Sequence, residues 1–106
     1  MIPLEKVQEI IAKHDNLEKE LSTGNVDSKL FAKKSKEYSD LGNIIFFARE
    51  YFKFGSHKKD LEQIIEDKSN DSEMIEMAEK DLFDLKNKNK EYENKLKIFL
   101  LPKDAD

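Results

Sequence analysis

The sequence contains no cysteine and no tryptophan, and only three glycines and two prolines occur among its 106 residues. Without cysteine the chain forms no disulfide and offers no thiolate, which fits a reducing compartment, so we expect a cytoplasmic protein. Three scattered glycines exclude a glycine-rich loop that binds phosphate. Few helix breakers together with abundant Glu and Lys are typical of long helices or a coiled coil.

Long hydrophobic runs are also missing. Charged residues make up 40% of the chain and the mean hydropathy is -0.78. No apolar stretch is long enough to span a bilayer or to serve as a signal sequence, so we expect a soluble protein without a membrane partner. The apolar residues nevertheless recur at regular intervals, unlike those of a disordered chain. The length supports a single domain over residues 1–106.

A basic patch is the third feature that the sequence lacks. The net charge is -4, and the largest basic clusters are the pairs Lys33–Lys34 and Lys58–Lys59. Proteins that neutralise nucleic-acid phosphates usually carry a basic face. We therefore expect no dominant direct nucleic-acid binding by this chain.

The first apolar stripe predicts a helix over residues 3–23. Its members recur at spacings of three and four residues, as on one face of a helix, and are Leu4, Val7, Ile11, His14, Leu17 and Leu21. Pro3 suits the first turn, where its missing N–H would have no partner. Gly24 can adopt the left-handed conformation that ends a helix.

Two overlapping stripes predict one long helix over residues 27–67. One stripe begins at Phe31, and the second begins at Ile44, before the first has ended. Successive residues on a helix are about 100° apart, so the two stripes face different partners. We expect the first half of this helix to pack on the first helix, and its second half on the third.

The middle of the long helix is apolar on nearly all sides, because residues 44–48 read Ile-Ile-Phe-Phe-Ala. We expect this segment to be buried all round and to form the centre of the core. Gly55 costs about 1 kcal/mol relative to alanine inside a helix, so a kink or split around Gly55–Ser56 is the alternative. The second stripe resumes in phase at Leu61, which favours a continuous helix.

A third stripe predicts a helix over residues 71–101. Its apolar members alternate three and four residues apart, which is a heptad seam. Asn89 is its one polar member. It is either buried, where it would fix the register of the seam, or solvated at a poorly covered position.

These helices define an all-α fold, an elongated antiparallel three-helix bundle with a coiled-coil hairpin. A helix of about 40 residues is roughly 60 Å long. The turn near Lys68 therefore lies at the tip of a two-helix hairpin, and a compact three-helix region forms the other end. We expect a projecting arm.

Residues with catalytic or metal-binding potential do not form a recognisable site. His14 lies on the apolar stripe, where we expect a hydrogen-bonded interfacial histidine, and His57 is expected to face water. Neither has the histidine partner four residues away that a helical metal site requires. Paired carboxylates such as Glu18 and Glu20 lack a pocket that would shift a pKa. We therefore predict no enzyme activity, no cofactor and no metal.

Three segments together resemble the bacterial class I release factor family. They are SKEYSDL at Ser35–Leu41, EMIEMAEKDL at Glu73–Leu82 and LLPKD at Leu100–Asp104, which are similar to the family's SKEYAEL, EMREMAEEEL and LLPKD. Their order and spacing agree with those of the family's first domain, and the resemblance covers essentially the whole chain. Two departures lie near the expected tip. Asp71 is followed by serine where the family's DPE turn has proline, and the region from Gly55 to Asn70 is a few residues longer.

The resemblance implies a part in translation termination. In the family a tripeptide of a later domain reads the stop codon, and a Gly-Gly-Gln motif promotes hydrolysis of peptidyl-tRNA. Neither motif occurs here, so we interpret residues 1–106 as the N-terminal domain, with the codon-reading and Gly-Gly-Gln domains absent. The resemblance also implies that the ribosome is the partner, through proteins at the stalk base of the large subunit, together with the recycling GTPase release factor.

The exposed tip of the hairpin is the predicted site of partner contact, with Lys68, Asn70 and Asp71 as its residues. Two other functions remain open, namely a helical arm that grips tRNA and a coiled-coil adaptor that dimerises through its seam. Leu100, Leu101 and the phenylalanines near the centre are not all expected to be covered. The isolated fragment is therefore expected to form dimers without physiological meaning.

Overall fold

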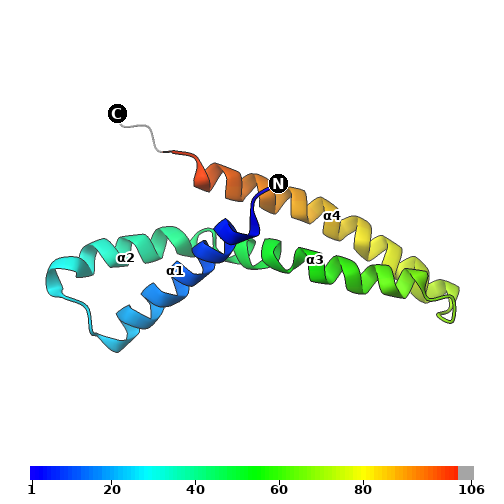
Figure 1. Cartoon of the computed structure of the whole chain (residues 1–106), viewed down its shortest axis with the longest axis horizontal. Helices are drawn as coiled ribbons and strands as arrows, with labels where there is room; N and C mark the ends of the chain where they lie inside the picture. Colours follow the sequence, from blue (N-terminus) through cyan, green and yellow to red (C-terminus); the bar gives the residue numbers. More distant parts are fainter. Residues whose placement is uncertain (103–106) are drawn as a thin grey trace.

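The computed structural model describes residues 1–102, and these form four helices (Figure 1). The helices are α1 (Leu4–Thr23), α2 (Ser28–Gly42), α3 (Ile45–Glu66) and α4 (Ser72–Leu100). The helices α1 and α2 form one antiparallel hairpin and α3 and α4 form another, and the two extend in opposite directions from a shared centre. The molecule measures 61 × 35 × 19 Å, so the predicted elongated all-α fold is confirmed.

The predicted long helix over residues 27–67 is divided in two, and the prediction of one continuous helix is wrong. The α2 helix ends at Gly42, and the N–H groups of Asn43 and Ile44 donate to carbonyls of the last turn, at 3.3 Å to Asp40 and 3.0 Å to Leu41. Gly42 and Asn43 are adjacent weak helix formers. These two residues lie at the point where the packing partners of the chain change. The α2 helix packs only on α1 and α3, whereas α3 also packs along α4.

The alternative break at Gly55 is also wrong, since α3 runs through this residue without interruption. A single glycine costs about 1 kcal/mol, which packing along the whole length of α4 readily offsets. A Cβ atom at Gly55 would meet no other atom within 4 Å. The space around Gly55 therefore allows the methyl group of an alanine.

Gly55, inside a helix, and Gly24, at the end of one, are expected to respond in opposite ways to replacement by alanine. We expect Gly55→Ala to raise the free energy of unfolding by about 0.5–1 kcal/mol, because alanine is the better helix former and no contact opposes it. Gly24 instead ends α1 with a φ of 73°, so Gly24→Ala is expected to lower stability by about 1 kcal/mol. Urea unfolding followed by circular dichroism measures both changes, and shifts of the same sign would contradict the prediction.

The core lies where α1 crosses the junction between α2 and α3. Its buried residues come from every helix and from the N-terminal segment, and are Ile2, Val7, Ile10, Leu17, Leu41, Ile44, Ala48, Tyr51 and Leu96. The predicted core at residues 44–48 is thus confirmed for Ile44 and Ala48. All-round burial is wrong for Phe46, which is 57% exposed although its ring centroid lies 5.9 Å from that of Tyr92 on α4.

The N-terminal segment ties α1 to both helices of the second hairpin. Ile2 is buried, and its N–H donates a 3.1 Å hydrogen bond to the hydroxyl of Tyr51 on α3. The N-terminal ammonium of Met1 lies 2.7 Å from a carboxylate oxygen of Glu93 on α4. This hydrogen-bonded ion pair, more than any other contact, lowers the pKa of Glu93 from its usual value.

The seam between α3 and α4 is only partly covered, as expected for two helices without a third. Ala78 and Leu96 are buried on α4, whereas Leu82, Leu85 and Tyr92 are half-buried. The side-chain oxygen of Asn89 is shielded from solvent and has no hydrogen-bond partner in the part of the chain described. The residue as a whole is half-buried and lines an open hollow, so its position lies between the buried and the solvated alternatives.

Candidate interaction site at the hairpin tip

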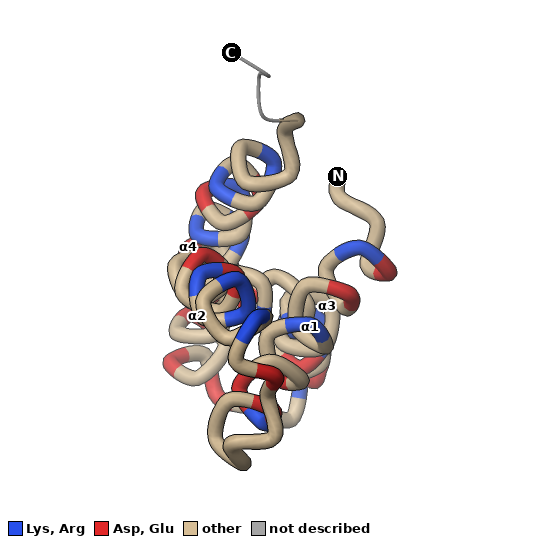
Figure 2. The backbone as a smooth tube through the Cα atoms, turned by 90° about the vertical axis from the view of Figure 1, so that its left-hand side faces the viewer, with Lys and Arg blue, Asp and Glu red and all other residues tan. Residues whose placement is uncertain are grey.

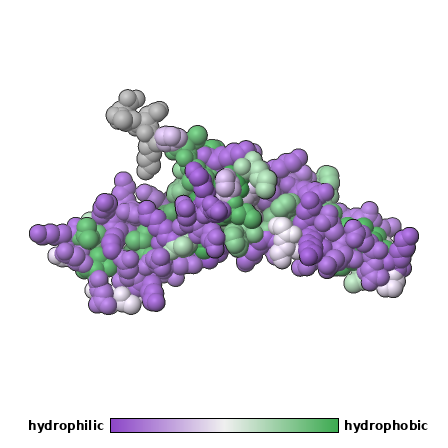
Figure 3. All heavy atoms as spheres, in the orientation of Figure 1, coloured by the Kyte–Doolittle hydropathy of each residue, from purple (hydrophilic) through white to green (hydrophobic). Residues whose placement is uncertain are grey.

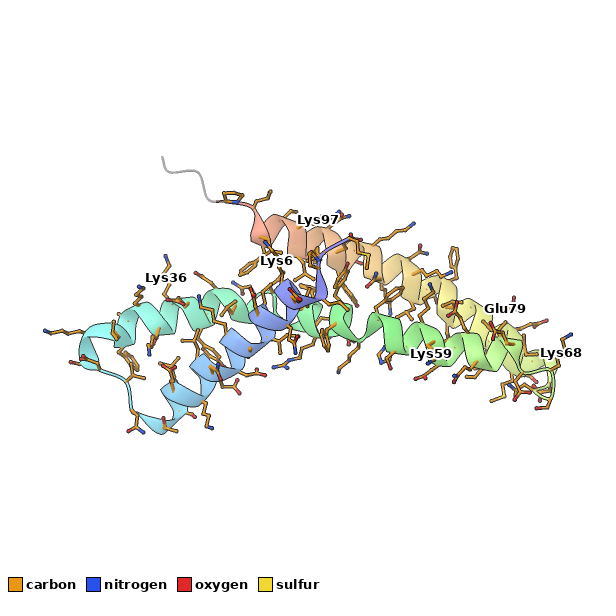
Figure 4. The ribbon with its side chains drawn as sticks, in the orientation of Figure 1. Lys6, Lys36, Lys59, Lys68, Glu79 and Lys97 are labelled. Atoms are coloured by element: carbon orange, nitrogen blue, oxygen red, sulfur yellow. The ribbon has the colours of Figure 1, made fainter. Side chains whose placement is uncertain are left out.

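The turn between α3 and α4 lies at the far end of the second hairpin, with Lys68 at its extremity (Figure 4). The α3 helix closes with a 3.1 Å hydrogen bond from the N–H of Asp67 to the carbonyl of Gln63. A second 3.1 Å bond, from the N–H of Asn70 to the carbonyl of Asp67, closes the turn itself. The structure therefore brings the predicted site residues together in one short turn.

The three predicted residues have different roles in the turn. The side-chain amide of Asn70 donates a 2.9 Å hydrogen bond to the carbonyl of Ile64, which gives this carbonyl at the end of α3 a partner. A carboxylate oxygen of Asp71 accepts a 2.8 Å hydrogen bond from the N–H of Met74 and thereby caps α4. Lys68 is exposed, and its ammonium has no carboxylate partner within residues 1–102. Asn70 and Asp71 thus hold the turn in shape, while Lys68 is available to a partner.

Sequence reasoning missed the part played by Asp67. One of its carboxylate oxygens accepts hydrogen bonds from the Ser69 hydroxyl at 2.6 Å and from the Ser69 N–H at 3.0 Å. These bonds, the hydroxyl first, lower the pKa of Asp67 from its usual value. The signal was present, because aspartate followed two residues later by serine is typical of a turn in which the side chain binds the backbone ahead.

The tip is acidic despite the projecting lysine. Residues 66–73 contain four carboxylates and one ammonium group. Figure 2 shows basic and acidic residues together along the helices. The net negative charge of the tip opposes contact with nucleic-acid phosphates. Within residues 66–73, Lys68 is the group that can pair with an acidic side chain of a protein partner.

His14 forms part of a polar network that joins α1 to α2 and α3. His14 is buried, and its Nδ1 donates a 2.9 Å hydrogen bond to a carboxylate oxygen of Asp15. The centroid of its ring lies 5.0 Å from that of Tyr38 on α2. Arg49 of α3 donates 2.6 Å to the same oxygen of Asp15. The prediction of a hydrogen-bonded interfacial histidine is confirmed, and His57 is exposed as predicted.

The carboxylates considered for acid–base work also join helices. The hydroxyl of Tyr38 on α2 donates 2.8 Å to Glu18 on α1, and this bond raises the pKa of Tyr38 from its usual value. Lys34 of α2 forms a hydrogen-bonded ion pair with Glu20. Within residues 1–102 no group of histidine or acidic side chains is arranged to hold a metal ion. No helix in that range has an apolar stretch long enough to cross a bilayer.

The Asp15 network predicts a dependence of stability on pH. The hydrogen bond from His14, followed by that from Arg49, lowers the pKa of Asp15 from its usual value. A carboxyl group whose pKa is lower in the folded than in the unfolded state stabilises the fold above its unfolded pKa, about 3.9, and this contribution is lost as the pH falls through the folded pKa. We expect Asp15→Asn to destabilise the protein at pH 5 and the deficit to shrink towards pH 2. Urea unfolding at both pH values measures it, and a constant deficit would contradict the assignment.

The described residues thus form an elongated module of two helical hairpins, and side-chain hydrogen bonds hold the turn at its tip. The profile of the PCRF domain matches residues 10–106, which is most of the chain, and the chain therefore belongs to the PCRF domain family. Together with the relatives described next, this match confirms the resemblance to release factors. Lys103 and Asp104, at the end of the most specific matching segment, lie outside the described residues, whereas Leu100 ends α4.

Several curated relatives are similar to the chain along nearly its full length. Peptide chain release factor 1 of Pelagibacter ubique is 59% identical over 98% of this chain, and that of Rhizobium rhizogenes is 34% identical over 98%. Peptide chain release factor 1 of Streptococcus pneumoniae is 35% identical over 96%. The chain spans about 29% of the length of each of these relatives. No solved structure matches the chain significantly.

Proposed function

We propose that the chain is the N-terminal helical module of a cytoplasmic translation termination factor, which recognises stop codons and promotes hydrolysis of peptidyl-tRNA on the ribosome. Membership of the PCRF domain family and similarity to relatives named peptide chain release factor 1 support this proposal. The relatives are about three times longer than the matched region, so codon reading and hydrolysis would reside in other parts of such a protein. In this proposal the module itself supplies no catalytic group.

The module serves as an interaction arm, and its contact site is the α3–α4 tip. The observation that carries this role is the position of Lys68, exposed and without an ion-pair partner, on a turn that four side-chain hydrogen bonds hold in shape. Sites on a fixed backbone lose little entropy when they bind. The partner is proposed to be a protein at the stalk base of the large ribosomal subunit.

The test uses Lys68→Glu in a full-length factor that carries this module. We expect its affinity for ribosomes halted at a stop codon to fall several-fold, as measured by competition with a labelled wild-type factor. The matched control is Lys59→Glu, which reverses the charge of an exposed lysine on the side of α3, and it should change affinity less than twofold. The same two variants test binding of the recycling GTPase release factor.

Two outcomes separate the parts of the proposal. Equal affinities of the Lys68 and Lys59 variants would exclude the tip as the contact site but leave the termination role intact. Failure of the wild-type factor to release peptide at any stop codon would exclude the termination role itself. Binding of tRNA by the isolated module at low salt would instead favour a tRNA-gripping arm.

A further inference from the structure

A groove follows one side of the α3–α4 hairpin, between its centre and its tip. It consists of two adjoining hollows of about 410 and 240 Å³, and both are lined by His57, Leu85 and Lys88. The hollow towards the tip also contains Leu61, and the one towards the centre contains Phe54. The two helices lie side by side over this whole distance (Figure 4), so the groove is continuous with their seam.

The groove has an apolar floor that the fold leaves without a partner. Leu61, Leu85 and Phe54 are only half-buried. Phe46 is 57% exposed at the central end, and Met77, 64% exposed, lies one helical turn beyond Asp81 on the same face of α4. Figure 3 shows apolar residues emerging among hydrophilic ones along the hairpin. An apolar row with exposed ends is typical of a surface that binds another helix.

The rim of the groove is acidic in the half nearer the tip. Asp60 of α3 and both Asp81 and Asp84 of α4 line this half, whereas Lys88 is the one Lys or Arg that does so. Among the Asp, Glu, Lys and Arg side chains of this half, three negative charges and one positive charge leave a formal charge of -2. None of the three aspartates forms an ion pair within residues 1–102. Unpaired carboxylates beside an apolar floor complement a basic amphipathic ligand and repel anionic surfaces.

We propose that this groove binds an amphipathic helix of another protein, with an apolar stripe edged by lysine or arginine. The stretch from Phe46 to Leu61 is about 15 residues, or ~22 Å, which corresponds to about four turns of a bound helix. Apolar anchors at positions i, i+4, i+7 and i+11 of that helix fit the row of floor residues, and basic residues near its end meet the aspartates. The inference does not depend on the proposed function of the tip, since the groove lies on the side of the hairpin.

The experiment titrates a synthetic 18-residue helical peptide, with a leucine stripe flanked by lysines, into the isotope-labelled chain. We expect the peptide to change the amide chemical shifts of Leu61 and Leu85. We also expect the dissociation constant of the peptide to rise at least tenfold in the double variant that combines Asp81→Lys and Asp84→Lys. The matched control combines Glu76→Lys and Glu79→Lys, which make the same charge change at exposed positions on the outer face of α4. The control should weaken binding less than twofold. Circular dichroism of both double variants establishes that they are folded.

Three results would overturn the proposal. Equal losses in the two double variants would indicate attraction by overall charge, not binding in the groove. Equal affinity for a peptide with glutamate in place of lysine would show that the acidic rim does not contribute to binding. Shift changes at the groove that grow with protein concentration in the absence of peptide would make a second copy of this chain the occupant.

Discussion

Replacing Leu96 with alanine is expected to lower the free energy of unfolding by about 3 kcal/mol. Leu96 has no exposed surface, and it is the residue through which α4 enters the core formed with α1, α2 and α3. Alanine would remove buried methyl groups and leave a cavity that the helices cannot close without losing other contacts. A domain of this size has a stability of about 5–15 kcal/mol, so the loss is a large part of the total.

Chemical denaturation followed by far-ultraviolet circular dichroism measures the effect of Leu96→Ala. The matched control is Leu101→Ala, because Leu101 is 63% exposed and its truncation should change stability by less than 1 kcal/mol. Similar losses for the two variants would show that α4 does not enter the core as described. A loss confined to a second unfolding transition would show that the two hairpins unfold separately.

Replacing Ala48 with leucine is expected to destabilise the protein by about 2–3 kcal/mol, the second largest effect. Ala48 has no exposed surface, and it lies on α3 in the core beside α1. A small residue at this position allows the two helices to approach closely, and a larger side chain would push them apart. The change increases hydrophobicity, so destabilisation would identify close packing as the cause.

The control for Ala48→Leu is Ala32→Leu, the same substitution at an exposed position of α2. It should alter the free energy of unfolding by less than 0.5 kcal/mol, because leucine and alanine are both good helix formers. Thermal unfolding of the two variants at equal concentration gives the comparison. A stability of the Ala48 variant equal to that of the Ala32 variant would mean that α1 and α3 can separate without loss.

The helix ends illustrate how much of the fold could be predicted from sequence. The first and third predicted helices, 3–23 and 71–101, agree within one residue with α1 and α4. Gly24 has the expected left-handed conformation, and Asp71 caps α4. These features depend on residues within one or two turns of each other, so their cause is local.

The candidate site could be predicted only in part. The tip was placed correctly because the turn interrupts two long apolar stripes at Lys68–Asn70. The sequence did not separate the residues that hold the turn, such as Asn70, from the residue that projects, because the bond from Asn70 to Ile64 exists only in the closed turn. Asp67 was missed although the serine two residues later is a local signal for such a turn. The identity of the partner at the tip stays a prediction.

The sequence by itself determined which segments are helical, the end of α1 at Gly24 and the absence of strands in residues 1–102. These features depend on periodicity and capping, which act over a few residues. Only the tertiary structure decided that the helix breaks at Gly42 and not at Gly55. The helices packed against each segment determine whether a residue with low helix propensity interrupts it. The tertiary structure also decided that Ile2 is buried against Tyr51 and that a groove remains along α3 and α4. These features join residues far apart in the chain, and their free energy comes from packing between helices that local sequence does not specify.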